Sequence, residues 1–362
     1  MTSHERMRVA IIGQGRSGKA IHGDTLNRLK DKFEIAAVVD PLEERRQKAA
    51  ETYGCEVLGD YKELLGRTDI DLVVNATPSH MHVPVTLELL NHGQHVLCDK
   101  PLARYAAEVD QLIQASGRTG SRLFVFQQSR FLPGYRKIRA IVDSGVIGRV
   151  VQVHIAYNGF ARRWDWQTLR EYNAGNLLNT GPHPVDQALQ FIGTQQMPQV
   201  TCYMDRANTL GDAEDYVKLL MSAPGKPVVD VEISSCCAYP GLTYNIQGTL
   251  GGIRGSGTHL DWKYYKPEEA PPQQLTHAPY VNEQGEPAYC REELKWHEHS
   301  WDFADEHQLG SFDHMCREYY IHLHDHLTQG VPLEITLEEV RQQIAVMEEC
   351  HKQNPLPSVA AE

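Results

Sequence analysis

The chain has 362 residues, which is longer than one hydrophobic core usually serves, so its length predicts two domains. Hydrophobic residues make up 41% and charged residues 23%, the composition of an ordinary globular protein. The net charge of −12 argues against a nucleic-acid or anionic membrane surface. No apolar run reaches the roughly 20 residues of a membrane span, and the first residues lack a signal-peptide pattern.

The eight cysteines show no CxxC spacing, which favours reduced thiols in a cytoplasmic protein. His322 and His326 are spaced to share one helix face, but no HExxH pattern accompanies them. We therefore expect no metal site, and neither nucleic acid nor membrane as a partner.

The first third of the chain begins with an apolar run over 7–12 (MRVAII), then a GxGxxG turn at Gly13, Gly15 and Gly18, then a predicted helix over 19–29. A second apolar run ends at Asp40. A strand, a glycine-rich turn, a helix and an acid about twenty residues on are typical of a dinucleotide-binding unit. Its glycines permit a tight turn, a close approach to the pyrophosphate and close helix–strand packing.

Asp40 is expected to accept hydrogen bonds from the adenosine ribose hydroxyls and to repel a 2′-phosphate, which favours NAD over NADP. Arg45 and Arg46 keep NADP open, because a guanidinium there could bind a phosphate. Exposed positions on a helix over 42–54 are the simpler interpretation of both arginines.

Further strands and helices alternate up to residue 128 and predict a doubly wound parallel sheet with right-handed crossovers. Ligands of such sheets bind at the carboxyl ends of the strands. This places 75–82 (NATPSHMH) and 98–101 (CDKP) on the side of the cofactor.

A different pattern occupies 175–192 (GNLLNTGPHPVDQALQFI), where Val185, Ala188, Leu189 and Ile192 recur at helical spacing. The prolines at 182 and 184 suit the first turn of that helix. His183 is therefore expected to project from a rigid helix start, and an ordinary histidine pKa near 6.5 suits proton transfer near neutrality.

Together, GxGxxG, NATPSHMH, DKPLA and GPHPVDQAL resemble the glucose–fructose oxidoreductase, inositol dehydrogenase and rhizopine-catabolism (Gfo/Idh/MocA) family. The resemblance extends to 144–150 (SGVIGRV) and to 319–340 near the carboxyl end. It implies a Rossmann domain over 1–129 and a substrate-binding α/β domain over 130–362. The second domain would have an open, mostly antiparallel sheet that builds homodimers or homotetramers.

The resemblance also implies a reaction: hydride transfer between NAD(P) and a secondary hydroxyl of a sugar, glycoside or inositol-like cyclitol. Lys100 matches the lysine of the family's Glu-Lys-Pro motif, beside the nicotinamide, and Asp99 replaces the glutamate. His183 matches the histidine of an Asp-x-Gly-x-His-x-x-Asp motif, in which Asn179 replaces the first aspartate.

Hydride leaves a carbinol carbon only as its O–H proton is taken away, so a base must contact that oxygen. An amide at Asn179 can bind a hydroxyl but carries no charge and moves no proton. We therefore expect Lys100 and His183 to handle the proton, with Asn179 as a third active-site residue. Asp186 either orients another group or binds backbone.

The residues expected to bind the cofactor lie in the glycine-rich turn and at the strand ends: Gly13, Gly15, Arg16, Ser17, Gly18, Asp40, Arg45, Ala76, Thr77, Pro78, His82, Asp99, Lys100 and Gln128. Those expected to contact the substrate combine arginines and aromatic residues with the catalytic set: Lys100, Arg130, Tyr157, Arg163, Trp164, Trp166, Asn179 and His183. Some of these aromatic residues could be structural, and the arginines could indicate a carboxylated or phosphorylated sugar.

The stretch 262–300 contains five prolines and little periodicity, and we interpret it as a surface excursion that could reach a neighbouring subunit. Two other functions stay open besides the dehydrogenase. One is an NAD-dependent lyase or glycosidase that oxidises its substrate transiently, and the other is a cofactor-binding sensor without turnover.

Overall fold

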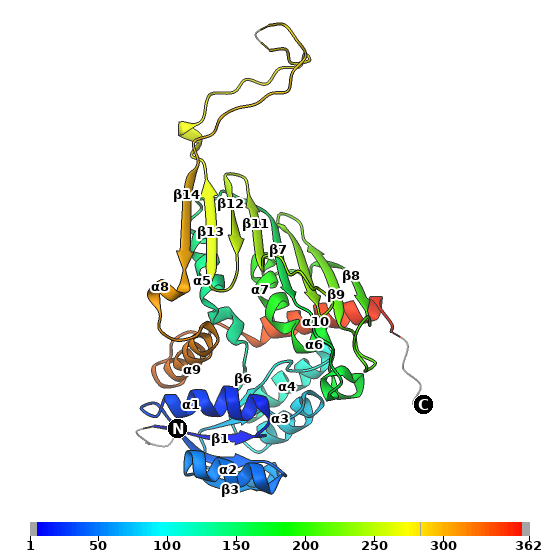
Figure 1. Cartoon of the computed structure of the whole chain (residues 1–362). Coiled ribbons are helices and arrows are strands. Elements are labelled where there is room, and N and C mark those ends of the chain that lie inside the picture. Colours follow the sequence, from blue (N-terminus) through cyan, green and yellow to red (C-terminus); the bar gives the residue numbers. More distant parts are fainter. Residues whose placement is uncertain (1–5, 283, 357–362) are drawn as a thin grey trace.

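The computed structural model describes residues 6–282 and 284–356, which build two sheets covered by helices (Figure 1). The first sheet is parallel, in the order β3-β2-β1-β4-β5-β6. Its strands are β1 Met7–Ile12, β2 Phe33–Val39, β3 Glu56–Leu58, β4 Leu72–Asn75, β5 Val96–Cys98 and β6 Leu123–Val125. This strand order reverses direction between β1 and β4, the position at which such sheets bind dinucleotides.

Except for the edge strand β3, the strands of this sheet are buried on both faces, as their continuous apolar runs predict. The covering helices are α1 Asp24–Arg28, α2 Glu43–Tyr53, α3 His82–Asn91 and α4 Ala106–Thr119. The prediction of one helix over 19–29 is wrong in one respect. A π-helical segment, η1 Ser17–Gly23, precedes a short α1. The strand β3 was missed, since it has only three residues and begins with an exposed glutamate.

The second sheet has eight strands in the order β14-β13-β12-β11-β7-β10-β9-β8 and is antiparallel except between β7 and β10. Its strands are β7 Val150–Asn158, β8 Gln199–Asp205, β9 Tyr216–Ser222, β10 Val228–Ser234, β11 Tyr244–Gly248, β12 Gly251–Gly255, β13 His259–Tyr264 and β14 His297–Asp302. The predicted pairing of a Rossmann sheet with an open, mostly antiparallel sheet is confirmed.

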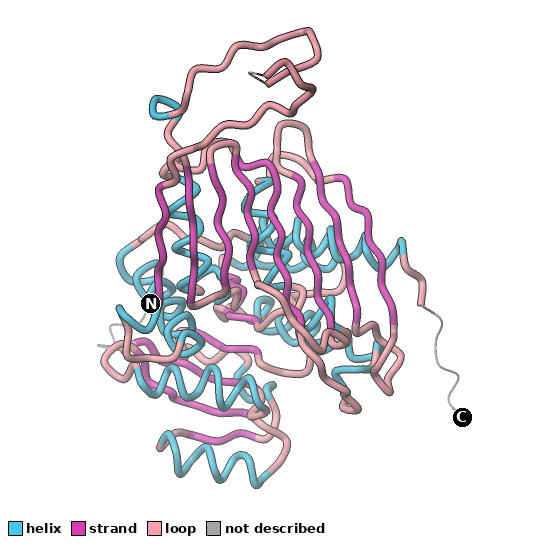
Figure 2. The backbone as a smooth tube through the Cα atoms, turned by 45° about the horizontal axis from the view of Figure 1, so that its top comes forward, coloured by secondary structure: helices cyan, strands magenta, loops and turns pink. Residues whose placement is uncertain are grey.

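Helices cover one face of the second sheet and leave the other open (Figure 2). They are α5 Pro133–Asp143, α6 Asn176–Asn179, α7 Pro182–Ile192 and α10 Leu337–Gln353. Alternate residues of β7 show the two environments, because Val153 and Ile155 are fully buried whereas Gln152 and His154 are only partly so.

The carboxyl-terminal part of the chain returns to the first sheet through α8 Phe303–Glu306, α9 Ser311–Gln329 and α10. The Tyr319 hydroxyl donates to the Val125 carbonyl at 2.8 Å, at the end of β6. Arg341 of α10 binds Asp110 of α4 through two nitrogens. These contacts join the two sheets into one body and fix the walls of the space between them. No helix among the described residues is long and apolar enough to cross a membrane.

Residues 265–282 and 284–296 leave the end of β13 and project far beyond the sheet before returning to β14 (Figure 1). The excursion expected over 262–300 is therefore shorter, because its two ends belong to β13 and β14 and pair with each other.

Arg130, which we expected to contact the substrate, lies instead in the core between the domains, with 5% of its surface exposed. Its Nε and Nη2 donate to the two carboxylate oxygens of Asp186 at 2.8 and 2.7 Å. Its Nη1 donates to Glu339 at 3.0 Å and to the Glu334 carbonyl. Because these bonds use the donors of the guanidinium, the prediction of a substrate contact is corrected, and Asp186 has a structural role.

This buried ion pair predicts a large effect of Asp186→Asn on stability. The substitution removes the carboxylate that neutralises Arg130 most directly, and breaking a buried pair from one side costs roughly 3 kcal/mol or more. Urea unfolding followed by circular dichroism measures the loss. Glu334→Gln is the matched control, since it breaks only the exposed pair with Arg136 and should cost at most about 1 kcal/mol. Equal losses in the two variants would contradict the assignment.

Candidate active site

A cleft of about 830 Å³ lies at the carboxyl ends of the parallel strands. The expected cofactor residues that line it are Gly13, Gly15, Arg16, Ser17, Asp40, Arg45, Ala76, Thr77, Pro78, His82, Asp99, Lys100 and Gln128. The second domain closes the cleft with Arg163, Asp165, Trp166, Gln167 and Asn179. The volume is within the range of sites for cofactors and small molecules.

The glycine-rich turn has the shape that a dinucleotide needs. Gly13 has φ +91°, and a Cβ there would lie 2.6 Å from the Ala76 carbonyl oxygen. Gly18, which does not line the cleft, packs so closely on the Gly13 carbonyl that no side chain fits. At Gly15 the space is open, so a phosphate can approach the backbone. The turn therefore fits a pyrophosphate.

Asp40 holds the far end of the cleft, almost fully buried at the end of β2. Its carboxylate accepts hydrogen bonds from the amides of Gln14 at 2.8 Å and Leu42 at 2.9 Å. The exposed Arg45 lies 3.4 Å away, whereas Arg46 donates to the carbonyls of Asp40 and Pro41. The carboxylate of Asp40, held by two amides, therefore lies at the position at which a 2′-phosphate would bind.

Two residues at this end of the cleft, Asp60 and Tyr61, were not predicted. They follow β3, and residues at strand ends were our guide to cofactor contacts. Recognition of that three-residue strand would have pointed to them.

Lys100 lies at the opposite end of the cleft. Its Nζ donates to the backbone carbonyl of Asn179 at 2.5 Å, across the two domains. Burial lowers the pKa of Lys100; Asp99 opposes this, while the positive charges of Arg16 and Arg163 add to it. The amine is therefore easier to deprotonate than an exposed lysine.

His183 projects from the first turn of α7, as predicted, but lines a second cavity of about 640 Å³ beside the cleft. Burial lowers the pKa of His183 to about 3, and the positive charge of Lys100 acts in the same direction. The expectation of an ordinary pKa near 6.5 is therefore wrong, and the imidazole is neutral at neutral pH. Its Nδ1 is buried without a partner among the described residues.

Asn179 lines the cleft and is followed in the chain by Thr180, which lines this cavity. The side-chain oxygen of Asn179 accepts a hydrogen bond from Gln167 at 3.4 Å, while its carbonyl binds Lys100. Gln167 in turn accepts from Arg163, which also binds Asp165. The sequence pattern gave no reason to expect Asp165 and Gln167, since their role is to hold other side chains.

The expected aromatic contacts separate into two groups. Trp166 lines the cleft, and Tyr157 lines the cavity of His183 with its hydroxyl near Gln187 and Tyr244. Trp164 lines neither space and is 77% exposed, so within a single chain its predicted substrate contact is not made.

A buried network behind Lys100 was not expected. The carboxylate of Asp99 accepts from the Lys100 amide at 2.8 Å and from the Ser17 hydroxyl. His22 lies 3.7 Å from Asp99 and binds the Tyr320 hydroxyl of α9 at 2.7 Å. Although burial raises it, His22 and Lys100 hold the pKa of Asp99 below its ordinary value. Only the fold brings residues so far apart in the sequence together.

His82 also shapes the cleft. Its Nδ1 and Nε2 lie 2.7 and 2.9 Å from the carbonyls of Pro101 and Thr77, so it braces the two strand ends against each other. Because both nitrogens contact backbone, a contact with the cofactor would use only the face of the ring.

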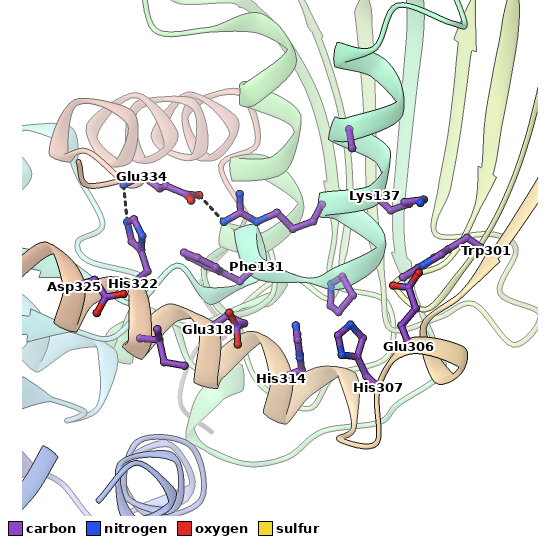
Figure 3. Close-up of a pocket in the computed structure, with 14 residues that line it drawn as sticks. Phe131, Lys137, Trp301, Glu306, His307, His314, Glu318, His322, Asp325 and Glu334 are labelled. Atoms are coloured by element: carbon purple, nitrogen blue, oxygen red, sulfur yellow. Dashed lines mark hydrogen bonds and ion pairs between the residues drawn. The ribbon is translucent and has the colours of Figure 1, made fainter. Parts of the chain in front are cut away.

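Another cavity, of about 630 Å³, lies between α5, α8 and α9, away from the cleft (Figure 3). Histidines 307 and 314 face each other there, with ring centroids 4.5 Å apart. His322 accepts from the Glu334 amide, and Arg136 binds the Glu334 carboxylate. This cavity lacks the lysine and the glycine-rich turn. Among the described residues, no group of three or more His, Cys, Asp and Glu side chains is placed to hold a metal ion.

Comparison with known proteins agrees with this arrangement. Residues 7–127 match the profile of an oxidoreductase family with an NAD-binding Rossmann fold, and residues 135–254 match the GFO/IDH/MocA carboxyl-terminal domain. Inositol 2-dehydrogenase 2 of Saccharopolyspora erythraea is 31% identical over 256 residues, 69% of this chain and 72% of that protein. The 2,7-anhydro-N-acetylneuraminate hydratase of Mediterraneibacter gnavus is 28% identical over 252 residues, 68% of this chain and 66% of that protein.

Among solved structures, the WlbA dehydrogenase of Bordetella pertussis, in complex with NADH and UDP-GlcNAcA, superimposes with a TM-score of 0.78. The superposition covers 98% of this chain and 97% of that one, at 20% sequence identity. At this low sequence identity the superposition bears on the fold alone. It shows that the fold agrees over nearly the whole chain. On these sequence matches, with the glycine-rich turn and the two sheets that carry the cleft, the chain belongs to the Gfo/Idh/MocA family of NAD(P)-dependent oxidoreductases.

Proposed function

We propose that this protein transfers a hydride between NAD and a secondary hydroxyl of an uncharged sugar, glycoside or cyclitol. The observation that carries the proposal is the hydrogen bond from the Lys100 amine in the cleft to the carbonyl of Asn179, four residues before His183 in the first turn of α7. The names of the inositol 2-dehydrogenase relatives support a cyclitol or a similar polyol.

The chemistry follows from the two side chains. The glycine-rich turn and Asp40 would hold NAD, which would supply the hydride acceptor. Lys100 takes the hydroxyl proton as a neutral amine, which its lowered pKa makes available, and the ammonium returns the proton to a ketone in the reverse direction. The Asn179 carbonyl holds Nζ in place.

His183 has a different part from the one that the sequence suggested. With a pKa of about 3 it carries no charge at neutral pH. We infer that it binds the substrate hydroxyl as a neutral hydrogen-bonding group, and that Lys100 alone exchanges the proton.

The lining of the His183 cavity indicates the class of substrate. It combines Tyr157, Phe160 and Phe312 with small hydroxyl and amide side chains, and its described residues include no Lys, Arg, Asp or Glu. Aromatic faces pack on the C–H faces of sugar rings, and hydroxyls bind their oxygens. Arg163, in the adjacent cleft, is paired with Asp165. A neutral polyol fits this surface better than a phosphorylated or carboxylated sugar.

The experiment that tests the proposal is a screen of NADH formation with inositols, aldoses, glycosides and uronates. We expect turnover with neutral polyols, and a loss of about 100-fold or more in kcat for Lys100→Ala. Fluorescence titration with NADH checks that the variant still binds the cofactor. Reduction of the cofactor by Lys100→Ala as fast as by the parent would refute the assignment of the base.

A second function is favoured by one observation, the similarity to a protein named as a hydratase. Transient oxidation by a tightly held NAD, followed by addition or elimination and return of the hydride, would use the same lysine. Conversion of an anhydro sugar or glycoside without net NADH distinguishes this reaction from the dehydrogenase.

The position of Asn179 generates a prediction for pH dependence. In Asn179→Asp a carboxylate near Nζ stabilises the ammonium and raises the pKa of Lys100, so the neutral amine forms only at higher pH. The ascending limb of kcat/KM for oxidation should therefore move up by roughly one pH unit. Asn179→Ala, which keeps the carbonyl but adds no charge, is the control. If the limb of the aspartate variant does not move, Lys100 is not the group that titrates.

The carboxylate at the far end of the cleft predicts the choice of cofactor. Asp40→Asn keeps the shape of the side chain but removes the charge that repels a 2′-phosphate. We expect the ratio of kcat/KM for NADP to that for NAD to rise by about tenfold, equivalent to about 1.4 kcal/mol. Adding Arg45→Ala should reduce the gain if that guanidinium binds the phosphate. An unchanged ratio in Asp40→Asn would contradict the role of this carboxylate.

A further inference from the structure

The π-helical turn η1 brings two side chains to one carboxylate, that of Asp99, the residue before Lys100. The Ser17 hydroxyl donates to Asp99 Oδ2, and His22 Nε2 lies 3.7 Å from the same oxygen. Ser17 and His22 are five positions apart. In an α-helix, side chains five apart point about 140° away from each other, because each residue turns by about 100°. The wider π-helical turn, whose hydrogen bonds span five residues, places both on the side of Asp99.

His22 is fully buried, and its two ring nitrogens lie beside different groups. Its Nδ1 is 2.7 Å from the hydroxyl of Tyr320 on α9, which is also fully buried. Among the described residues this hydroxyl has no other hydrogen-bond partner, so its proton is directed to Nδ1. The ring proton of neutral His22 is therefore on Nε2, the nitrogen beside Asp99.

Asp99 connects this arrangement to the lysine. Its other oxygen, Oδ1, accepts a hydrogen bond from the Lys100 backbone amide at 2.8 Å. The negative charge of Asp99 raises the pKa of Lys100 and so opposes the effect of burial. A donor beside Oδ2 offsets part of that charge, because its N–H or O–H group carries a partial positive charge. Without such a donor, more negative charge would stabilise the ammonium.

We propose that His22 is a positioning residue for the proposed reaction: together with Ser17 it holds Asp99 and limits how strongly that carboxylate stabilises the Lys100 ammonium. Tyr320 contributes by keeping the ring proton of His22 on Nε2. The second domain would therefore act on the lysine at two places, through α9 and through the Asn179 carbonyl. The effect on the reaction rate rests on the proposed function, whereas the effect on the charge of the lysine needs no substrate.

Other charged groups act on the same amine and are not altered by a change at His22. Arg16 and Arg163 lower the pKa of Lys100 through their positive charges. His82 lies on the other side of the strand end, but both of its ring nitrogens contact backbone carbonyls, so it cannot replace His22 as a donor. A shift of the lysine in a His22 variant is therefore assigned to the carboxylate of Asp99.

The proposal is tested by the pH dependence of kcat/KM in both directions of the reaction. In His22→Leu the carboxylate stabilises the ammonium more strongly, so the ascending limb for oxidation should move up by roughly half to one pH unit. The descending limb for ketone reduction, which needs the ammonium, should move up with it. A loss of packing alone would lower both rates without moving either limb. His22→Gln, whose amide can still donate to Asp99, should return both limbs most of the way to the parent positions.

Two neighbouring tyrosines of α9 provide a matched pair of variants. Both hydroxyls are buried, but Tyr319 donates to the Val125 carbonyl and not to His22. Tyr320→Phe keeps the ring and should move the limbs in the same direction as His22→Leu, by a smaller amount. Tyr319→Phe should reduce stability and leave the limbs in place. Limbs that stay or move down in His22→Leu, or that move equally in Tyr319→Phe, would overturn the proposal. If His22→Leu does not fold, unmoved limbs in Tyr320→Phe decide against it.

A second measurement separates this proposal from the proposed function. Brief treatment with acetic anhydride over a range of pH, followed by mass spectrometry of the Lys100 peptide, reports the pKa of the amine without substrate. We expect the midpoint in His22→Leu to lie above that of the parent, in agreement with the kinetic limbs. If the parent oxidises no polyol, the proposed function fails, while the acetylation midpoints still decide the role of His22. Equal midpoints in the parent and His22→Leu would refute it.

Discussion

The hydrogen bond from the Lys100 amine to the Asn179 carbonyl is the contact on which the site depends. It joins the segment that follows β5 in the first domain to the end of α6 in the second. Because the acceptor is a backbone carbonyl, the bond survives the amide at position 179, which occupies the place of the family's aspartate. The replacement changes the charge around the lysine and leaves its position intact.

The pKa of the same lysine also depends on a buried network of side chains. Tyr320, His22 and Asp99 form a buried chain that reaches the Lys100 amide from the carboxyl-terminal helix α9. This network offsets part of the negative charge of Asp99, which would otherwise stabilise the ammonium more strongly. Burial and the positive charges of Arg16 and Arg163 therefore favour a lysine that can release its proton.

The two spaces beside this lysine differ in charge, and the difference matches their proposed occupants. The cleft is lined by charged side chains of both signs, among them Arg16, Arg45, Arg163 and four aspartates, whereas the described lining of the His183 cavity is uncharged. A neutral polyol would be selected by shape, hydroxyl contacts and aromatic faces.

Local pattern determined much of this protein. The parallel strands, the glycine-rich turn with Asp40, the helix that begins beside His183 and the position of Lys100 at a strand end could all be read from the sequence, because each follows from periodicity or from one tight turn. Only the tertiary structure decided that Arg130 is paired with Asp186, that His183 is uncharged and that His22, which binds Tyr320, lies beside Asp99. These depend on burial and on contacts between residues far apart in the chain, which no local pattern contains.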